Sequence, residues 1–131
     1  MVNFPLKCGS ETILTAEDNE DIRFLTKNIL EEYGYYVIEA VDGEDAVKKY
    51  IENKDRIQLV MMDVIMPKKS GKEAVDLIRD ITPGVRVLYS SGYTADIIDI
   101  KNIREEGADF ISKPVTPRNL LLKIREVLDR T

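Results

Sequence analysis

The sequence of 131 residues contains no histidine, and this absence removes several kinds of chemistry. Serine–histidine catalysis, histidine-based zinc sites and a chain that phosphorylates its own histidine are all excluded, because each of them needs an imidazole. Any acid–base or metal chemistry must therefore use carboxylates, lysine and hydroxyl groups.

Cysteine is nearly absent too. Cys8 is the only one, so no disulfide can form within the chain, and a cytoplasmic location is expected. No apolar run approaches the roughly 18 residues of a membrane span, and no signal-peptide core is seen at the start. The net charge of −5, without any cluster of lysine or arginine, argues against nucleic acid or an anionic membrane as a direct partner.

The length predicts a single domain, and 44% apolar with 33% charged residues is typical of a globular protein. Residues 1–10 show no periodicity and contain Pro5 and Gly9. We expect them to be a tail or the remnant of a linker, and residues 11–131 to be the folded domain.

Short apolar segments alternate with segments of helical periodicity. Strands are expected at 12–16, 36–40, 59–62, 85–89 and 108–111, with a helix after each, the fourth at about 94–106. Ser70 is a predicted helix N-cap, as is Thr116 with Pro117 at the first helical position. This alternation predicts an α/β fold, with a parallel sheet covered by helices on both faces. The expected helical core positions are Ile22, Leu25, Ile29, Tyr33, Ala46, Val47, Tyr50, Ile51, Ala74, Val75, Ile78, Leu120, Leu121, Ile124, Val127 and Leu128.

The run Leu59–Met62 leads directly into Asp63. A short apolar run without alternation is typical of a strand covered on both faces, although a buried helical turn gives the same pattern. Pro67 and Gly71 are expected to stop regular structure soon afterwards, so Asp63 should lie where a central strand ends. Taken alone, such an aspartate is more often a turn or cap residue.

Polar groups follow four of the predicted strands: Glu17 with Asp18, then Asp63, Ser91 and Lys113. Each has an ordinary explanation as a cap, a turn hydroxyl or a solvated charge. In a doubly wound sheet, however, the carboxyl ends of the strands meet at the ligand site.

Three converging carboxylates repel one another unless a cation joins them, and Mg²⁺ suits such oxygen ligands. These parts suit phosphoryl transfer, with Asp63 as nucleophile and Lys113 and Ser91 contacting phosphoryl oxygens.

From about residue 11 to 128 the chain resembles the CheY-like receiver domain of two-component response regulators. The resemblance is carried by Ile13–Asp18, Met62–Pro67 with Gly71, Ser90–Gly92 and Lys113–Pro114, with 28 residues between Asp63 and Ser91 and 22 more to Lys113. It implies a flavodoxin-like, doubly wound, five-stranded parallel sheet of order 2-1-3-4-5 with five helices in three layers.

The resemblance also implies a phosphorylation-controlled switch in a phosphorelay. Asp63 would accept a phosphoryl group from phosphohistidine on a sensor histidine kinase or a histidine phosphotransfer domain, so the chain would phosphorylate itself rather than turn over substrate. Asp18, Asp63 and the backbone carbonyl of Ile65 would hold Mg²⁺, with Glu17 acting through water. Ser91 and Phe110 would form the switch pair, and the Lys113–Pro114 bond would be cis.

Some positions leave alternatives open. Glu17 stands where aspartate is more usual, and Ser91 where threonine is frequent. Phe110 also suits an ordinary core position. Ile98 points away from the arc of Ile97, Ile100 and Ile103. An outward isoleucine is usually incidental, but with Phe110 it would mark a face for partners, including a possible homodimer.

Two further expectations concern the kind of receiver and the lifetime of its phosphoryl group. The runs Gly9–Leu14 and Ser91–Thr94 are similar to receivers of hybrid histidine kinases. Ile65 and Tyr93 flank the phosphoryl site and would obstruct an attacking water, which predicts a long-lived aspartyl-phosphate. The main alternative is an Mg²⁺-dependent phosphatase with an aspartyl nucleophile, but it would need a second acid at Ile65. A flavin site is disfavoured because the acidic run after the first strand repels phosphate, and an unphosphorylated scaffold because no site residue is missing.

Overall fold

The computed structural model describes residues 8–66, 68–92, 101, 105–106, 108–113 and 115–130. Within them, five strands form one sheet in the order β2-β1-β3-β4-β5, and all neighbouring strands are parallel. This is the predicted flavodoxin-like topology. The strands are β1 (Thr12–Ala16), β2 (Tyr36–Ala40), β3 (Ile57–Asp63), β4 (Val87–Ser91) and β5 (Asp109–Ser112).

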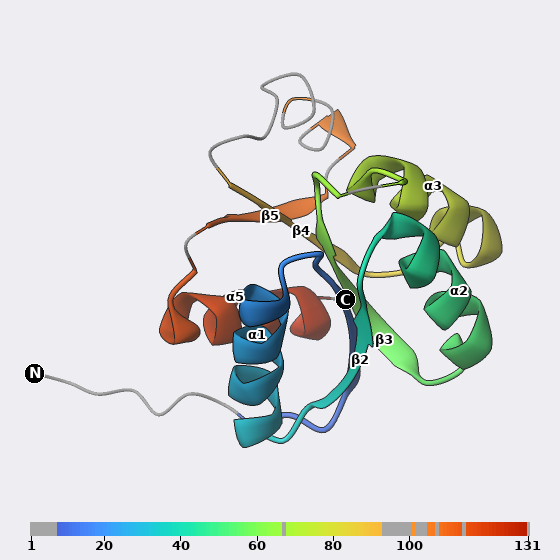
Figure 1. Cartoon of the computed structure of the whole chain (residues 1–131). Coiled ribbons are helices and arrows are strands. Elements are labelled where there is room, and N and C mark those ends of the chain that lie inside the picture. The colour runs from blue at the N-terminus through green and yellow to red at the C-terminus, as the bar shows by residue number, and fades with distance from the viewer. Residues whose placement is uncertain are drawn as a thin grey trace, which may run out of the picture.

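Helices cover both faces of this sheet. Helices α1 (Glu20–Glu32) and α5 (Pro117–Asp129) lie on one face, and α2 (Gly43–Asn53) and α3 (Gly71–Ile81) lie on the other (Figure 1). The three predicted layers are therefore present. Most of the helix predicted at 94–106 lies outside the described residues.

The helix starts follow from local capping chemistry. Side chains of Asp42, Ser70 and Thr116 each accept a hydrogen bond from the backbone N–H three residues later, as expected of N-caps. Helix α1 is capped by Asn19, so neither Glu17 nor Asp18 is its cap. Gly71, which we expected to stop regular structure, instead begins α3, because the Ser70 cap precedes it.

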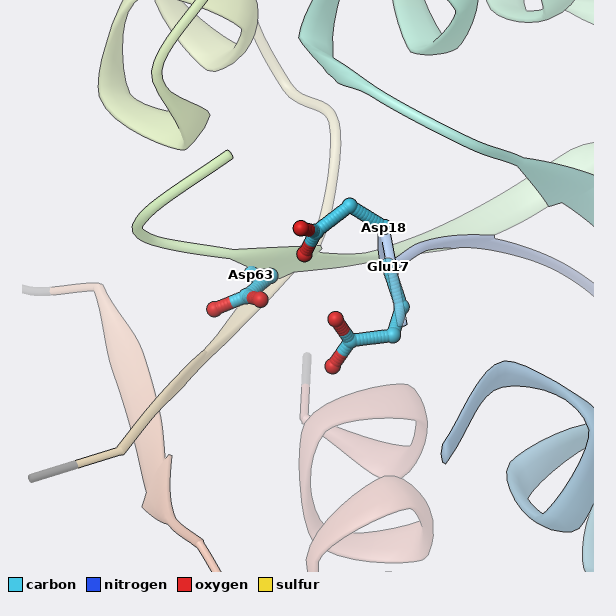
Figure 2. A group of neighbouring side chains, drawn as sticks. All are labelled: Glu17, Asp18 and Asp63. Atoms are coloured by element: carbon cyan, nitrogen blue, oxygen red, sulfur yellow. The ribbon is translucent and has the colours of Figure 1, made fainter. Parts of the chain in front are cut away.

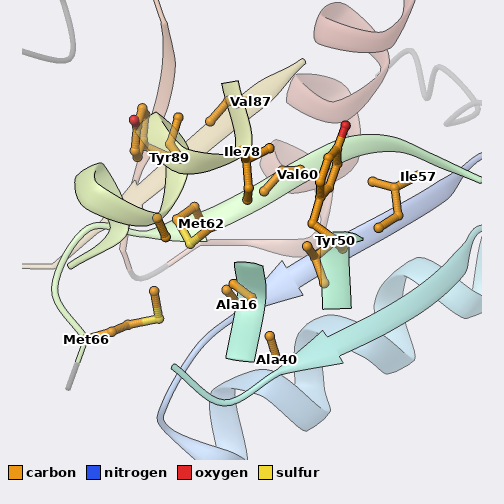
Figure 3. Packing of buried hydrophobic residues seen from close by; sticks show 14 of the residues in the cluster. Ala16, Ala40, Tyr50, Ile57, Val60, Met62, Met66, Ile78, Val87 and Tyr89 are labelled. Carbon is orange, nitrogen blue, oxygen red and sulfur yellow. The ribbon is translucent and has the colours of Figure 1, made fainter. Parts of the chain in front are cut away.

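The core has two parts, one on each side of β3. Val60 and Met62 pack with the α2 and α3 side chains (Figure 3), and Leu59 and Met61 pack with those of α1 and α5. All four are at most 8% exposed. This two-sided burial explains the continuous apolar run before Asp63.

Three predicted core positions are wrong. Ile22 and Leu25 of α1 are 40% and 59% exposed, while Leu30 is fully buried. The first turns of α1 border a cavity rather than a packed neighbour, which leaves these two side chains open. Ile51 of α2 is 54% exposed, because Tyr50, one position earlier on the helix, fills the core.

The residues before β1 contact the domain. The N–H of Gly9 donates to the carbonyl of Tyr33 at 2.9 Å. Both carboxylate oxygens of Glu11 accept from Arg125 of α5 at 3.0 Å. The end of the predicted tail is thus attached to the turn after α1. In the described part of the chain, no helix combines the length and apolar character needed to cross a membrane.

Candidate functional site

Three carboxylates meet at the carboxyl ends of β1 and β3. Ala16 pairs with Met62 in the sheet, so the two strands end side by side, and Glu17, Asp18 and Asp63 follow at the same edge. One oxygen from each carboxylate lies within 4.8 Å of the other two, and Figure 2 shows the three groups gathered together. Glu17 and Asp63 are buried, at 7% and 6% exposure, whereas Asp18 is exposed. The structure thus joins residues that are 46 positions apart in sequence, from Glu17 to Asp63.

Lys113 supplies the positive charge of this site. Its ammonium donates to Oδ2 of Asp63 at 3.0 Å and to Oε1 of Glu17. The backbone N–H of Lys113 donates to the carbonyl of Ser91 at 2.7 Å, which fixes the chain just after β5. Burial alone would lower the pKa of Lys113, but the hydrogen bonds to the two carboxylates outweigh it and raise the pKa. The ammonium therefore stays charged at neutral pH.

Glu17 is held by contacts that the sequence did not indicate. Its Oε2 accepts from the N–H of Asn19 at 3.1 Å, and its carbonyl accepts from the Arg23 guanidinium at 2.9 Å. The Nε atom of Arg23 also lies 3.8 Å from Oε1 of Glu39 in β2. An arginine on a charged helix face gives no sequence signal of such a role, because the contact depends on how α1 follows β1.

Asp18 carries the least compensated charge of the three. Partial burial raises the pKa of Asp18, and the neighbouring Glu17 carboxylate raises it further. Lys113 lowers it only through space, since its hydrogen bonds go to the other two carboxylates. Negative charge therefore remains available here for a cation.

The carboxylates border a cavity of about 290 Å³. Ser91 and Ile65 line it as well, with Ser91 buried at 4% exposure and Ile65 open at 44%. Phe110 lies on β5, half-buried, and packs against the core cluster under α2 and α3. Ile98, Tyr93 and Pro114 lie outside the described residues.

Gly71 fixes the backbone behind Asp63. Its N–H donates to the carbonyl of Val64 at 2.9 Å. A Cβ at Gly71 would lie 2.0 Å from the carbonyl oxygen of Asp63, so only a glycine fits there. The spacing of Gly71 from Asp63 was part of the sequence resemblance, but its close contact with the Asp63 carbonyl was not foreseen.

Comparison with known families matches residues 13–125 to the response regulator receiver domain. The chain belongs to the receiver-domain family of response regulators. This receiver domain is 33% identical over 116 residues to chemotaxis protein CheY of Thermotoga maritima, covering 88% of this chain and 95% of that protein.

Other relatives are longer. The receiver domain is 38% identical over 115 residues to the CAI-1 autoinducer sensor kinase/phosphatase CqsS of Vibrio cholerae, covering 86% of this chain but 16% of CqsS. It spans about half the length of transcriptional regulators that it also matches. Among solved structures, a receiver domain protein from Clostridium thermocellum superposes with a TM-score of 0.85 at 30% identity, covering 92% of this chain and 95% of that one. The family, its fold and its place in two-component signalling follow from these matches.

Proposed function

We propose that this receiver domain is switched by phosphorylation of Asp63, with phosphohistidine as donor and Mg²⁺ as cofactor. The observation that carries the proposal is the contact of the Lys113 ammonium with Asp63 beside two more carboxylates. A structural ion pair would need one carboxylate. The surplus negative charge instead suits a site that takes up a cation and then a phosphoryl group.

In the proposed transfer, a carboxylate oxygen of Asp63 attacks the phosphorus of the phosphohistidine. The new O–P bond forms as the N–P bond breaks, and the electron pair of that bond stays on the imidazole nitrogen, which takes up a proton. Lys113 neutralises one phosphoryl oxygen, and the Ser91 hydroxyl donates to another. The site contributes mainly position and charge, as is general for phosphoryl transfer.

The residues fit a bound Mg²⁺. The donors are carboxylate oxygens gathered within 4.8 Å at a cavity with room for water, which is the ligand set that this ion prefers. Asp18, Asp63 and the carbonyl of Ile65 would hold it, with Glu17 acting through water. When bound, Mg²⁺ neutralises charge on the phosphoryl oxygens and on the carboxylates around them.

The partner in this proposal is a protein that carries phosphohistidine, either a sensor histidine kinase or a histidine phosphotransfer domain. The match of this chain to CqsS favours a receiver that works with, or within, a sensor kinase. The domain would then comprise residues 11–131, with the preceding residues as a linker. We also propose that Phe110 and Ile98 form a face for binding partners. A second copy of the chain could bind through this face to form a homodimer.

The proposed function is tested by labelling. The chain is incubated with Mg²⁺ and acetyl phosphate, digested, and the phosphorylated peptide is identified by mass spectrometry. We expect one acid-stable, hydroxylamine-labile adduct on Asp63, formed only with Mg²⁺. A label on another residue, or steady hydrolysis of many phosphate esters, would replace the switch by a different activity such as a phosphatase.

Asp18→Asn should stabilise the metal-free domain at pH 7. The raised pKa of Asp18 means that its ionised form weakens folding above the folded-state pKa, and this loss disappears as the pH falls below its ordinary value of 3.8. Because Asp18 is exposed, solvent limits the gain to about 1 kcal/mol or less. Urea unfolding at pH 7 and pH 3 measures it.

With Mg²⁺ present, the wild type should become more stable than Asp18→Asn. At about 100 times its dissociation constant, Mg²⁺ would stabilise the wild type by roughly 2.7 kcal/mol, because it binds only the folded chain. Asp18→Asn loses a ligand and should gain little. Equal Mg²⁺ stabilisation of both proteins would remove Asp18 from the proposed metal site.

Ile65→Asn should shorten the life of the aspartyl-phosphate. Ile65 lines the cavity beside Asp63 with an exposed apolar side chain, which obstructs an attacking water, whereas an amide can position one. We expect hydrolysis to be up to about tenfold faster, measured as loss of label after the donor is removed. Ile65→Leu keeps an apolar group and should match the wild type, and equal decay in all three would contradict the obstruction.

A further inference from the structure

A second cavity, larger than the acidic one, lies between α1 and α5. Its volume is about 420 Å³, within the range of small-molecule sites. Figure 1 shows the two helices beside each other on one face of the sheet. The cavity extends down to the sheet, where Thr15, Met61 and Ser90 line it with exposures of 3%, 8% and 4%. Leu25 and Leu120 line it from the two helices.

One polar group in this lining has no partner. The Oγ1 atom of Thr15 is buried and makes no hydrogen bond with any residue that the structure describes. Strand alternation places Thr15 on the same face as Ile13, which packs under α1 and α5. A buried hydroxyl without a partner is costly, and a ligand with a polar group would satisfy it.

The other groups around the cavity define the ligand's chemistry. Most of the surface that lines the cavity is apolar, so the body of the ligand must be apolar as well. The charged groups at its edge already bind each other, since Lys113 donates to Glu17 and Arg23 donates to the Glu17 carbonyl. They leave no strong demand for a charged ligand.

We propose that this cavity binds a small, neutral, mostly apolar molecule whose hydroxyl group hydrogen-bonds to Thr15. A protein partner would meet the exposed side chains of Ile22 and Leu25. The floor residues Thr15, Met61 and Ser90 are at most 8% exposed, so a partner's helix, about 10 Å across, would cover the opening without contacting them. The depth of the cavity therefore favours a small molecule.

The two cavities share a wall. Glu17 and Lys113 line both the acidic cavity and the apolar one. A ligand that contacts them from the apolar side should alter how readily Asp63 is phosphorylated, and this second part of the inference rests on the proposed function. Binding itself does not depend on phosphorylation.

The binding site is tested with 2-naphthol and with naphthalene, which has the same rings but no hydroxyl. Titrations of the full chain are followed by two-dimensional NMR. We expect saturable shifts at residues lining the cavity with both probes. Thr15→Val keeps the shape but removes the hydroxyl, so it should weaken 2-naphthol about fivefold, the effect of one hydrogen bond, and leave naphthalene unchanged.

Two variants check the location. Thr26 and Leu25 line the cavity from α1, so Thr26→Phe should fill it and abolish binding of both probes. Leu25→Trp starts from an exposed position and serves the same purpose if the first variant does not fold. Shifts confined to exposed surface residues, or unchanged binding in the filled variant, would overturn the site.

The coupling has a separate readout. In the wild type, 2-naphthol should change the initial rate of labelling by acetyl phosphate at least about twofold, a modest coupling between sites, and it should have no effect in Thr26→Phe. Unchanged rates with saturable binding would overturn the coupling but keep the site. Binding should persist in Asp63→Asn, so failure of the proposed function and failure of the binding site give different results.

Discussion

Asp63→Asn is expected to reduce phosphoryl labelling to background while the domain stays folded. Asp63 is the carboxylate that Lys113 contacts at 3.0 Å at the end of the central strand. The amide has nearly the same shape but no anionic oxygen to attack phosphorus, so the O–P bond cannot form. Incubation with acetyl phosphate and Mg²⁺, followed by intact-mass measurement, checks the result.

A matched control separates the nucleophile from general loss of charge. Asp80→Asn removes one negative charge from an exposed position on α3 and should label like the wild type. Thermal melts confirm that both variants fold. Labelling that persists in Asp63→Asn would show that another residue accepts the phosphoryl group, and the proposed switch would have to be abandoned.

The positions of the candidate site residues could be predicted from the sequence because they follow from local patterns. A buried strand needs a continuous apolar run, and the residue after that run must lie at the sheet edge. This places Asp63 without any knowledge of its neighbours. The same reasoning places Glu17, Ser91 and Lys113 at the ends of their strands, and parallel topology brings those ends to one edge.

Errors arose where a boundary or a face depends on distant contacts. We predicted a strand at 85–89, but β4 is Val87–Ser91. Polar Ser90 and Ser91 continue the strand because their carbonyls accept from the N–H groups of Val64 and Lys113, which directly follow the two neighbouring strands. Sequence pattern shows where apolar residues end, whereas the strand continues as long as both neighbours supply hydrogen bonds.

Helix α1 illustrates a second limit. Periodicity placed Ile22, Leu25 and Ile29 on one face of the helix, but it did not include Leu30 and could not show whether a neighbour covers every turn of that face. Ile29 is half-buried and Leu30 is fully buried, while Ile22 and Leu25 border the apolar cavity. Such a partly covered face is where a binding site can form, and the two wrongly predicted core residues are the ones that border the apolar cavity.

Gly71→Ala should destabilise the domain by about 2–3 kcal/mol, the cost of inserting a methyl group into a packed site. The added Cβ would lie 2.0 Å from the carbonyl oxygen of Asp63 and 2.9 Å from its carbon. These are backbone atoms of the central strand and cannot rotate away as a side chain would. Either α3 or the end of β3 must move, so labelling of Asp63 should fall as well.

Gly84→Ala is the control, because nothing lies within 4 Å of the position that its Cβ would occupy. Alanine restricts the unfolded chain more than glycine does, so this variant should be neutral or stabilised by up to about 1 kcal/mol. Urea unfolding gives both values.

Helix propensity alone would make Gly71→Ala stabilising, since alanine is the better helix former. The sign of the change therefore decides whether the close contact with Asp63 or the helix itself explains the glycine. A stabilised Gly71→Ala protein that labels normally would show that the backbone behind the phosphorylation site can shift freely.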